Sequence, residues 1–314
     1  MRVVFMGTPD FAVASLNALI DAGHEVAAVI TQPDRPKGRG NKMAFPEVKT
    51  RALELNIPVH QPASVKDEAF LELLKGYNPE VIVVVAFGRI LPQPVLDLPP
   101  YGCINVHGSL LPEYRGAAPI QRAVLDGRKE TGVTTMRMDI GMDTGDMLMQ
   151  AKLPITDEDT TGTMFDKLAV LGGNLLIDTL TGLVNGTITP QKQDDSKATH
   201  AAMILKADEV IDWNNTAETI FCQIRGLSPA PGAYTWWNGE RLKLWKARIS
   251  DKETGKAPGT VVMITKEALT VQTGKGCLEV LELQPAGKKA MPAQAFSNGA
   301  GVAEGIVFGE TNES

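Results

Sequence analysis

The first thirty residues alternate between strand-like and helix-like patterns of hydrophobic residues. Residues 2–6 and 25–31 are short apolar runs that predict buried strands, and residues 10–22 have apolar side chains at helical spacing. Thr8 precedes this helix and is a candidate cap, while Gly23 follows its last turn and can end it. A strand, a helix and a second strand in this order predict a parallel sheet with helices on both faces.

The same kinds of pattern continue to residue 183. Residues 81–86 are apolar on both faces, as is typical of a central strand in a parallel sheet. Residues 160–183 predict a long helix with Gly172 and Gly173 as a weak point. The other elements predicted here are helices at 46–55 and 67–75, a strand at 103–107, and a hairpin of strands at 131–139 and 145–153.

The character of the chain changes after residue 186. The following stretch is polar and rich in helix-breaking residues, and we interpret 189–207 as a linker. Beyond it come a predicted helix at 215–225 and five short strands separated by turn residues, at 233–237, 241–249, 259–264, 268–272 and 277–283. Short strands at this spacing predict a small β-barrel.

These elements together predict an α/β fold with two domains. We expect a doubly wound, mostly parallel, Rossmann-like sheet in residues 1–188 and a smaller C-terminal β-barrel of the OB-like type in residues 208–314. A chain of 314 residues is longer than most single domains, and its 43% hydrophobic and 22% charged residues are typical of folded proteins.

Several function classes are disfavoured by what the sequence lacks. It has no continuous apolar run of membrane-spanning length and starts with a strand-like segment in place of a secretory leader. Cys103, Cys222 and Cys277 are too far apart for a zinc motif or a disulfide framework. We therefore expect a cytoplasmic protein without a membrane segment and without a metal site.

The distribution of charge leaves the question of a nucleic-acid partner open. The net charge of −6 and the pI near 5.4 argue mildly against one, because phosphate binding depends on a basic surface. Residues 34–50, however, contain five basic and two acidic residues around Gly38-Arg39-Gly40, in a stretch where we expect a loop. This segment is either a solvated surface loop or a site for an anionic partner.

The turn after the first strand argues against a dinucleotide cofactor. It begins at Gly7 and has the sequence Gly-Thr-Pro-Asp-Phe-Ala, which lacks the glycine fingerprint of the Rossmann dinucleotide site. Pro9 also removes a backbone N–H that a pyrophosphate would use.

Asn105 and His107 form the first candidate site. They are two positions apart on a predicted strand, so both side chains lie on the same face of the sheet. They lie where the strand ends, which is where open α/β sheets bind their ligands. A single histidine on a strand is more often structural, but an amide and an imidazole followed by a Gly-Ser-Leu-Leu-Pro loop favour a functional site.

A cluster of carboxylates at 139–146 is the second candidate. Its spacing lacks the alternating ligands and the closing glutamate of a calcium loop. The cluster is either a glycine-rich turn with solvated side chains or the source of a carboxylate that folds over His107. In the second case the carboxylate favours the charged form of the imidazole ring.

Asn105 and His107, followed by Ser109-Leu110-Leu111-Pro112 and by Asp143 36 residues after His107, resemble the active site of the 10-formyltetrahydrofolate-dependent formyltransferases. This superfamily acts on glycinamide ribonucleotide, on a UDP-amino sugar and on methionyl-tRNA. The resemblance implies catalytic roles for Asn105, His107 and Asp143. It also implies a folate site lined by Ser109, Leu110, Leu111 and Pro112, with Phe87, Gly88 and Ile90 as weaker candidates.

Further stretches resemble the methionyl-tRNA branch of this superfamily, so the resemblance covers nearly the whole chain. They are residues 5–11, 31–40, 116–121 and 283–289. The resemblance implies that 10-formyltetrahydrofolate is the formyl donor and that initiator methionyl-tRNA is the acceptor. It also implies that Arg39, Lys37 and Lys42 bind the tRNA. We expect a monomer that requires no metal.

Three other functions remain as alternatives. A formyltransferase for an amino-sugar nucleotide would share the chemistry but not the basic segment or the C-terminal barrel. A nicotinamide oxidoreductase is disfavoured by the missing glycine fingerprint. A non-catalytic RNA-binding protein could use the barrel, but it would have no need of Asn105, His107 and Asp143.

Overall fold

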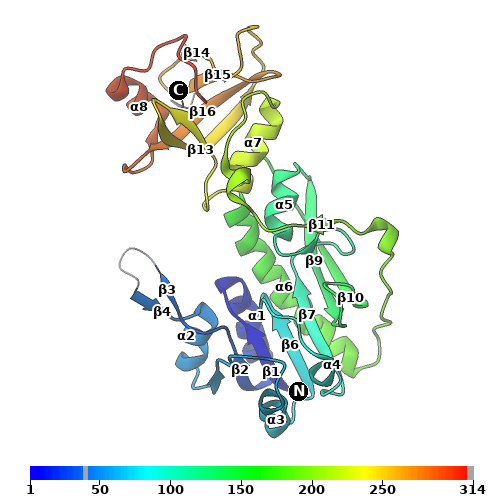
Figure 1. Cartoon of the computed structure of the whole chain (residues 1–314). Helices are drawn as coiled ribbons and strands as arrows, with labels where there is room; N and C mark the ends of the chain where they lie inside the picture. The colour runs from blue at the N-terminus through cyan, green and yellow to red at the C-terminus, as the bar shows by residue number, and fades with distance from the viewer. Residues whose placement is uncertain (38–41, 310–314) are drawn as a thin grey trace. The chain divides into compact units, whose positions relative to one another are not determined.

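The computed structural model describes residues 1–37 and 42–309, and the chain forms two compact units (Figure 1). The first contains Met1–Pro119, Glu130–Pro154 and Phe165–Ala201. The second contains Ile120–Lys129, Ile155–Met164 and the chain from Ala202 onward. The chain boundary at Ala201 falls inside the segment that the sequence suggested as a linker.

A seven-stranded sheet forms the centre of the first unit. Its strands are β1 (Arg2–Gly7), β2 (Glu25–Ile30), β5 (Val59–His60), β6 (Val81–Val85), β7 (Cys103–His107), β9 (Glu130–Arg137) and β10 (Met147–Pro154). Their order is β10-β9-β7-β6-β1-β2-β5, and only the pairs β7–β9 and β9–β10 are antiparallel. From β1 the chain first builds outward to β2 and β5 and then returns to β6 and β7, which creates a switch point at the carboxyl ends of β1 and β6.

Helices cover both faces of this sheet, as the α/β pattern predicted. They are α1 (Asp10–Asp21), α2 (Glu47–Glu54), α3 (Glu68–Tyr77), α4 (Gln93–Leu96) and the long α6 (Thr161–Val184). On one face, α3 and α4 pack on a core that includes Val4, Ile82 and Phe70. On the other face, α1 meets α6 through an edge-on contact of Phe11 and Phe165, with ring centroids 5.8 Å apart. The doubly wound architecture is thereby confirmed.

The two glycines of α6 are contact points and not a weak point, so that prediction is wrong. The helix continues through both of them. A Cβ atom at Gly172 would lie 2.9 Å from Val106 Cγ1, and one at Gly173 would lie 3.1 Å from the Ala14 carbonyl oxygen. Glycine fits these positions because the helix approaches β7 and α1 so closely that a side chain would require a neighbouring atom to shift.

α6 bears on the expectation that the chain has no membrane segment, although its apolar residues are interrupted by polar ones. Among the described helices it is long and apolar enough to cross a membrane, with a mean hydropathy of 1.3 over its best window. Of that window 44% is buried inside the protein. A buried core helix meets the same criteria of length and composition.

Two local predictions near the N-terminus are also wrong. Pro9, in extended conformation, occupies the N-cap position of α1 without a capping side chain, and Thr8 Oγ1 instead accepts a hydrogen bond from Gln32 N at 3.4 Å. Part of the basic segment, expected to be a loop, forms a short hairpin of β3 (Arg35–Lys37) and β4 (Lys42–Ala44). Arg39 lies outside the described residues, as do the side chains of Lys37 and Lys42.

The second unit contains an antiparallel sheet with the strand order β12-β13-β16-β15-β14, and β17 pairs with β16. Its elements are α7 (Ala217–Gly226), β12 (Tyr234–Trp237), β13 (Glu240–Ser250), β14 (Val261–Ile264), β15 (Leu269–Gln272), β16 (Cys277–Pro285), β17 (Met291–Pro292) and α8 (Ala293–Ala300). The sheet curls around Leu244 and Val280 with Ile220 of α7 and Phe296 of α8. Within the described chain its end strands β12 and β14 do not pair, so the sheet forms a half-barrel.

Candidate functional site

β7 positions the amide and the imidazole of the site. This strand lies between β6 and β9, where Asn105 is in register with Val84 and His107 with Thr134. Asn105 is 9% exposed and His107 is 6% exposed. Because strand residues two apart share a face, both side chains project from the same side of β7 at its carboxyl end.

Both ring nitrogens of His107 face oxygen atoms. Nε2 lies 3.0 Å from the carbonyl oxygen of Tyr114, and since a carbonyl can only accept, Nε2 is the donor. Nδ1 lies 3.7 Å from Asp143 Oδ1, which is within ion-pair range but longer than a hydrogen bond. Nδ1 is thus the nitrogen that remains available to a substrate atom.

Asp143 is the carboxylate of the β9–β10 loop that faces His107. Its backbone has a φ of 55°, a left-handed conformation that aspartate tolerates better than most residues. Its Oδ2 accepts a hydrogen bond from Gly116 N at 2.8 Å. Asp139 has a different role, because its Oδ1 accepts from Gly141 N and from Thr144 Oγ1 and stabilises the turn.

The Asn105 side chain makes no hydrogen bond with any residue in 1–37 or 42–309. A nearly buried amide usually has a partner within the protein. An amide beside His107 without such a partner can donate its N–H groups to a ligand.

The loop after β7 contains the candidate folate residues, and only some of them are accessible. Ser109 is fully buried, and its Oγ donates to the Glu113 carbonyl at 2.7 Å. Leu111 is 3% exposed, whereas Leu110 and Pro112 are half-buried. The side chains of Ser109 and Leu111 therefore hold the loop in shape, while Leu110 and Pro112 lie nearer its surface.

The weaker folate candidates are divided in the same way. Phe87 is 2% exposed and belongs to the core beneath α3 and α4. Gly88, with a φ of 75°, is exposed, and Ile90 is 56% exposed. Only Gly88 and Ile90 of this group can meet a ligand from the surface.

Thr134 and Gln150, two residues that sequence reasoning missed, fix this loop from the neighbouring strands. Thr134 Oγ1 donates to the Ser109 carbonyl at 2.7 Å and accepts from Leu111 N at 3.0 Å. Gln150 Nε2 donates to the Leu111 carbonyl at 2.8 Å and to Thr134 Oγ1 at 2.9 Å. A single polar residue on each strand of a hairpin forms no sequence motif, so only the hydrogen bonds in the structure show that Thr134 and Gln150 hold this loop.

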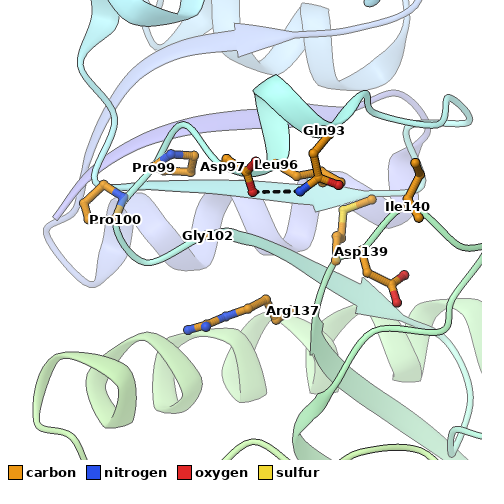
Figure 2. Close-up of a pocket in the computed structure, with 10 residues that line it drawn as sticks. Gln93, Leu96, Asp97, Pro99, Pro100, Gly102, Arg137, Asp139 and Ile140 are labelled. Atoms are coloured by element: carbon orange, nitrogen blue, oxygen red, sulfur yellow. Dashed lines mark hydrogen bonds between the residues drawn. The ribbon is translucent and has the colours of Figure 1, made fainter.

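A separate hollow of about 330 Å³ lies elsewhere in the first unit (Figure 2). Arg137 and Asp139 line it on one side, and the Gln93–Asp97 pair, hydrogen-bonded at 2.8 Å, lines the other. It contains none of Asn105, His107 and Asp143. No group of three or more metal-binding side chains occurs in the described part of the chain.

Comparison with known proteins identifies families that match most of the chain. Residues 1–180 match the model of a family described as Formyl transferase. Residues 203–301 match the model described as Formyl transferase, C-terminal domain.

Three similar curated proteins share one description. The methionyl-tRNA formyltransferase of Pelotomaculum thermopropionicum is 53% identical over 311 residues, covering 99% of both chains. The protein of that name from Moorella thermoacetica is 53% identical over 98% of this chain and 99% of its own length. The one from Desulfotalea psychrophila is 51% identical over 99% of this chain and 96% of its own.

Solved structures share the fold at lower identity. A sugar 3N-formyl transferase, WlaRD, solved in the presence of dTDP and 5-N-formyl-THF, has a TM-score of 0.68 at 19% identity and covers 92% of this chain and 99% of its own. HypX from Aquifex aeolicus, in complex with tetrahydrofolic acid, has a TM-score of 0.66 at 17% identity. It covers 100% of this chain and 51% of its own length.

Proposed function

The chain belongs to the formyl transferase family, and from this premise we infer that it transfers a formyl group from 10-formyltetrahydrofolate to the amino group of methionyl initiator tRNA. The match to methionyl-tRNA formyltransferases extends over at least 98% of each chain, including the C-terminal unit. The reaction serves the initiation of protein synthesis, and we propose that the enzyme acts in the cytoplasm. We propose that it acts as a monomer.

The proposal depends above all on the juxtaposition of His107 and Asp143 beside the Asn105 amide. Their 3.7 Å separation leaves His107 Nδ1 free to donate to a substrate oxygen while the carboxylate lies next to it. Such groups, fixed in place by buried contacts before the substrate arrives, are what stabilises charge that develops in a transition state.

In the proposed reaction, the amino nitrogen of the methionyl group attacks the formyl carbon and forms a new C–N bond. Negative charge then grows on the formyl oxygen, where the Asn105 amide and His107, with a proton on Nδ1 as well as on Nε2, donate hydrogen bonds that strengthen in the transition state. The bond from the formyl carbon to the folate nitrogen breaks as the tetrahedral intermediate collapses. Asp143, directly or through a water, accepts the proton that the amine loses. This proton is then passed to the departing folate nitrogen, which restores the carboxylate.

A folate co-substrate fits the loop that follows β7. We propose that the surfaces of Leu110 and Pro112, with the backbone of this loop, contact the folate, while Gly88 and Ile90 line the approach from β6. Ser109 and Leu111 act through the loop backbone, because their side chains are buried.

We propose that Arg39, Lys37 and Lys42 bind the acceptor end of the tRNA. A guanidinium can pair with phosphate through two hydrogen bonds and can stack on an exposed base. The C-terminal unit supplies the remaining tRNA contacts.

A formyl-transfer assay with purified protein tests the function. We expect transfer from 10-formyltetrahydrofolate to methionyl initiator tRNA, detected as N-formylmethionine after deacylation. The control reactions contain methionyl elongator tRNA or an amino-sugar nucleotide at the same concentration. Transfer to the amino-sugar nucleotide with none to the charged initiator tRNA would contradict the proposal.

A further inference from the structure

The segment that the sequence suggested as a linker is bound to the catalytic loops of the first unit. Its strand β11 (His200–Ala201) pairs in parallel with β8 (Arg115–Gly116), in the loop region after β7. Thr199 Oγ1 accepts a hydrogen bond from Tyr114 N at 2.8 Å. The Tyr114 carbonyl in turn accepts a hydrogen bond from His107 Nε2. The segment therefore contacts the imidazole indirectly, through the backbone of Tyr114.

Gln193 of the same segment holds the loop that carries Asp143. Gln193 is 6% exposed, and its Nε2 donates to the Asp143 carbonyl at 2.8 Å and to the Gly145 carbonyl at 2.7 Å. One amide thus uses both of its N–H groups on two carbonyls of a single tight turn.

Arg115 fixes the orientation of this amide. Gln193 Oε1 accepts from Arg115 Nε at 3.0 Å and from Nη2 at 2.8 Å, and a guanidinium can only donate. The nitrogen of the amide must therefore point to the loop carbonyls. Asp195 Oδ1, 2.8 Å from Arg115 Nη2, completes the chain of contacts.

These contacts reach the carboxylate of Asp143 through its backbone. Gln193 holds the carbonyl of Asp143, while Gly116, which follows Arg115, donates its N–H to the carboxylate at 2.8 Å. The Asp143 backbone has a left-handed φ of 55°, a conformation that costs free energy and persists where surrounding contacts impose it. Gln193 and Arg115 together supply such contacts.

We propose that Gln193 is a positioning residue for the reaction, holding the Asp143 carboxylate next to His107 through the paired amide and guanidinium. The inference rests on the proposed function of Asp143 and adds to it a requirement for a residue 50 positions away in the sequence. Gln193 itself does not touch the reacting atoms.

Two substitutions of Gln193 test this role. Gln193→Glu keeps the shape and the contact with Arg115 but points a carboxylate oxygen at two carbonyls, and Gln193→Leu removes the polar group altogether. Residues that orient metal-binding side chains typically contribute about 10- to 100-fold to activity. We expect kcat to fall by a similar factor when the residue that orients Asp143 is replaced. KM for folate and for tRNA should change by less than about three-fold, because substrate contacts are untouched.

Gln191 provides the matched control. It is a glutamine of the same segment with an exposed side chain. Gln191→Glu and Gln191→Leu should keep wild-type kcat. Circular dichroism and folate binding show whether Gln193→Leu folds. If it does not, kcat of the isosteric variant Gln193→Glu decides the test.

A double-substitution cycle separates positioning from a general loss of structure. In the background of Asp143→Asn, substitution of Gln193 should lower the remaining turnover by less than about three-fold, because residues that act as one unit are not additive. A full 10- to 100-fold loss in both backgrounds would overturn the inference, as would a Gln193→Glu enzyme with wild-type kcat. A wild-type enzyme that transfers no formyl group to tRNA would instead refute the proposed function.

Discussion

Asn105→Ala separates catalysis from stability more sharply than any other substitution in the site. Asn105 is 9% exposed, and its side chain has no hydrogen-bond partner among residues 1–37 and 42–309. Its removal breaks no hydrogen bond and leaves no buried group without a partner. A broken hydrogen bond and a buried group left without a partner are the usual causes of a large loss of stability in a polar-to-alanine substitution, and neither occurs here.

The expected effect on turnover is much larger than the effect on folding. Removal of one oxyanion donor lowers kcat by about 100- to 1,000-fold, or about 2.7–4 kcal/mol in the activation free energy. The free energy of unfolding should change by less than about 1 kcal/mol. Asn105→Asp keeps the shape of the side chain but replaces the donor by an acceptor, so it should lower kcat at least as far.

Single-turnover formylation at saturating 10-formyltetrahydrofolate and methionyl-tRNA measures the rate of the chemical step. Urea unfolding measures the free energy of unfolding. Asn185, exposed after the end of α6, provides a control variant, Asn185→Ala, with wild-type kcat. An Asn105→Ala enzyme within about three-fold of wild-type kcat would refute the role of the amide, since three-fold is below 1 kcal/mol. A loss of kcat that simply follows a loss of folded protein would refute it as well.

Three further predictions concern other parts of the molecule. Gly172→Val should lower the free energy of unfolding by about 1–3 kcal/mol, because a Cβ there would lie 2.9 Å from Val106 Cγ1. Urea unfolding measures this change. The control is Gly76→Ala in the last turn of α3, where a Cβ meets no other atom, and it should be at least as stable as wild type. Burial raises the pKa of the Cys103 thiol to about 12, so iodoacetamide at about pH 8 should modify it only after unfolding; mass spectrometry that finds native Cys103 alkylated would contradict this. Arg39→Leu should slow formylation of methionyl-tRNA and weaken its salt dependence without changing folate binding, and rates and salt slopes equal to wild type would show that Arg39 does not bind tRNA.

The sequence by itself determined most of the regular elements. Residues 103–107 form β7 as predicted, and the five C-terminal strands appear close to their predicted bounds. These predictions succeed because a strand or helix with one buried face repeats its apolar positions every two or 3.6 residues, and that repeat is local. The common face of Asn105 and His107 follows from the same period of two.

Burial and conformation along the chain were less predictable where neighbouring elements set them. The glycines of α6 suggested a weak helix, but the close approach of α6 to β7 and α1 explains them. Ser109 and Leu111 belong to a motif typical of a folate site, yet their side chains are enclosed by the protein. The amino-acid sequence shows which chemical groups are present, while the packing of other elements decides which of their atoms are accessible.

The residue pattern alone left open which carboxylate of residues 139–146 faces His107, and the family resemblance named Asp143. Only the tertiary structure shows what holds this carboxylate near His107. Asp139 and Asp143 have similar surroundings in the sequence, but Asp139 caps its own turn whereas Asp143 accepts from Gly116 and lies 3.7 Å from His107. Gln193 lies in a polar stretch that predicts a linker, and its two donors reach a loop about 50 residues earlier in the chain. Hydrogen bonds between such distant segments leave no periodic pattern in the sequence, because they depend on how the sheet brings its loops together at one edge.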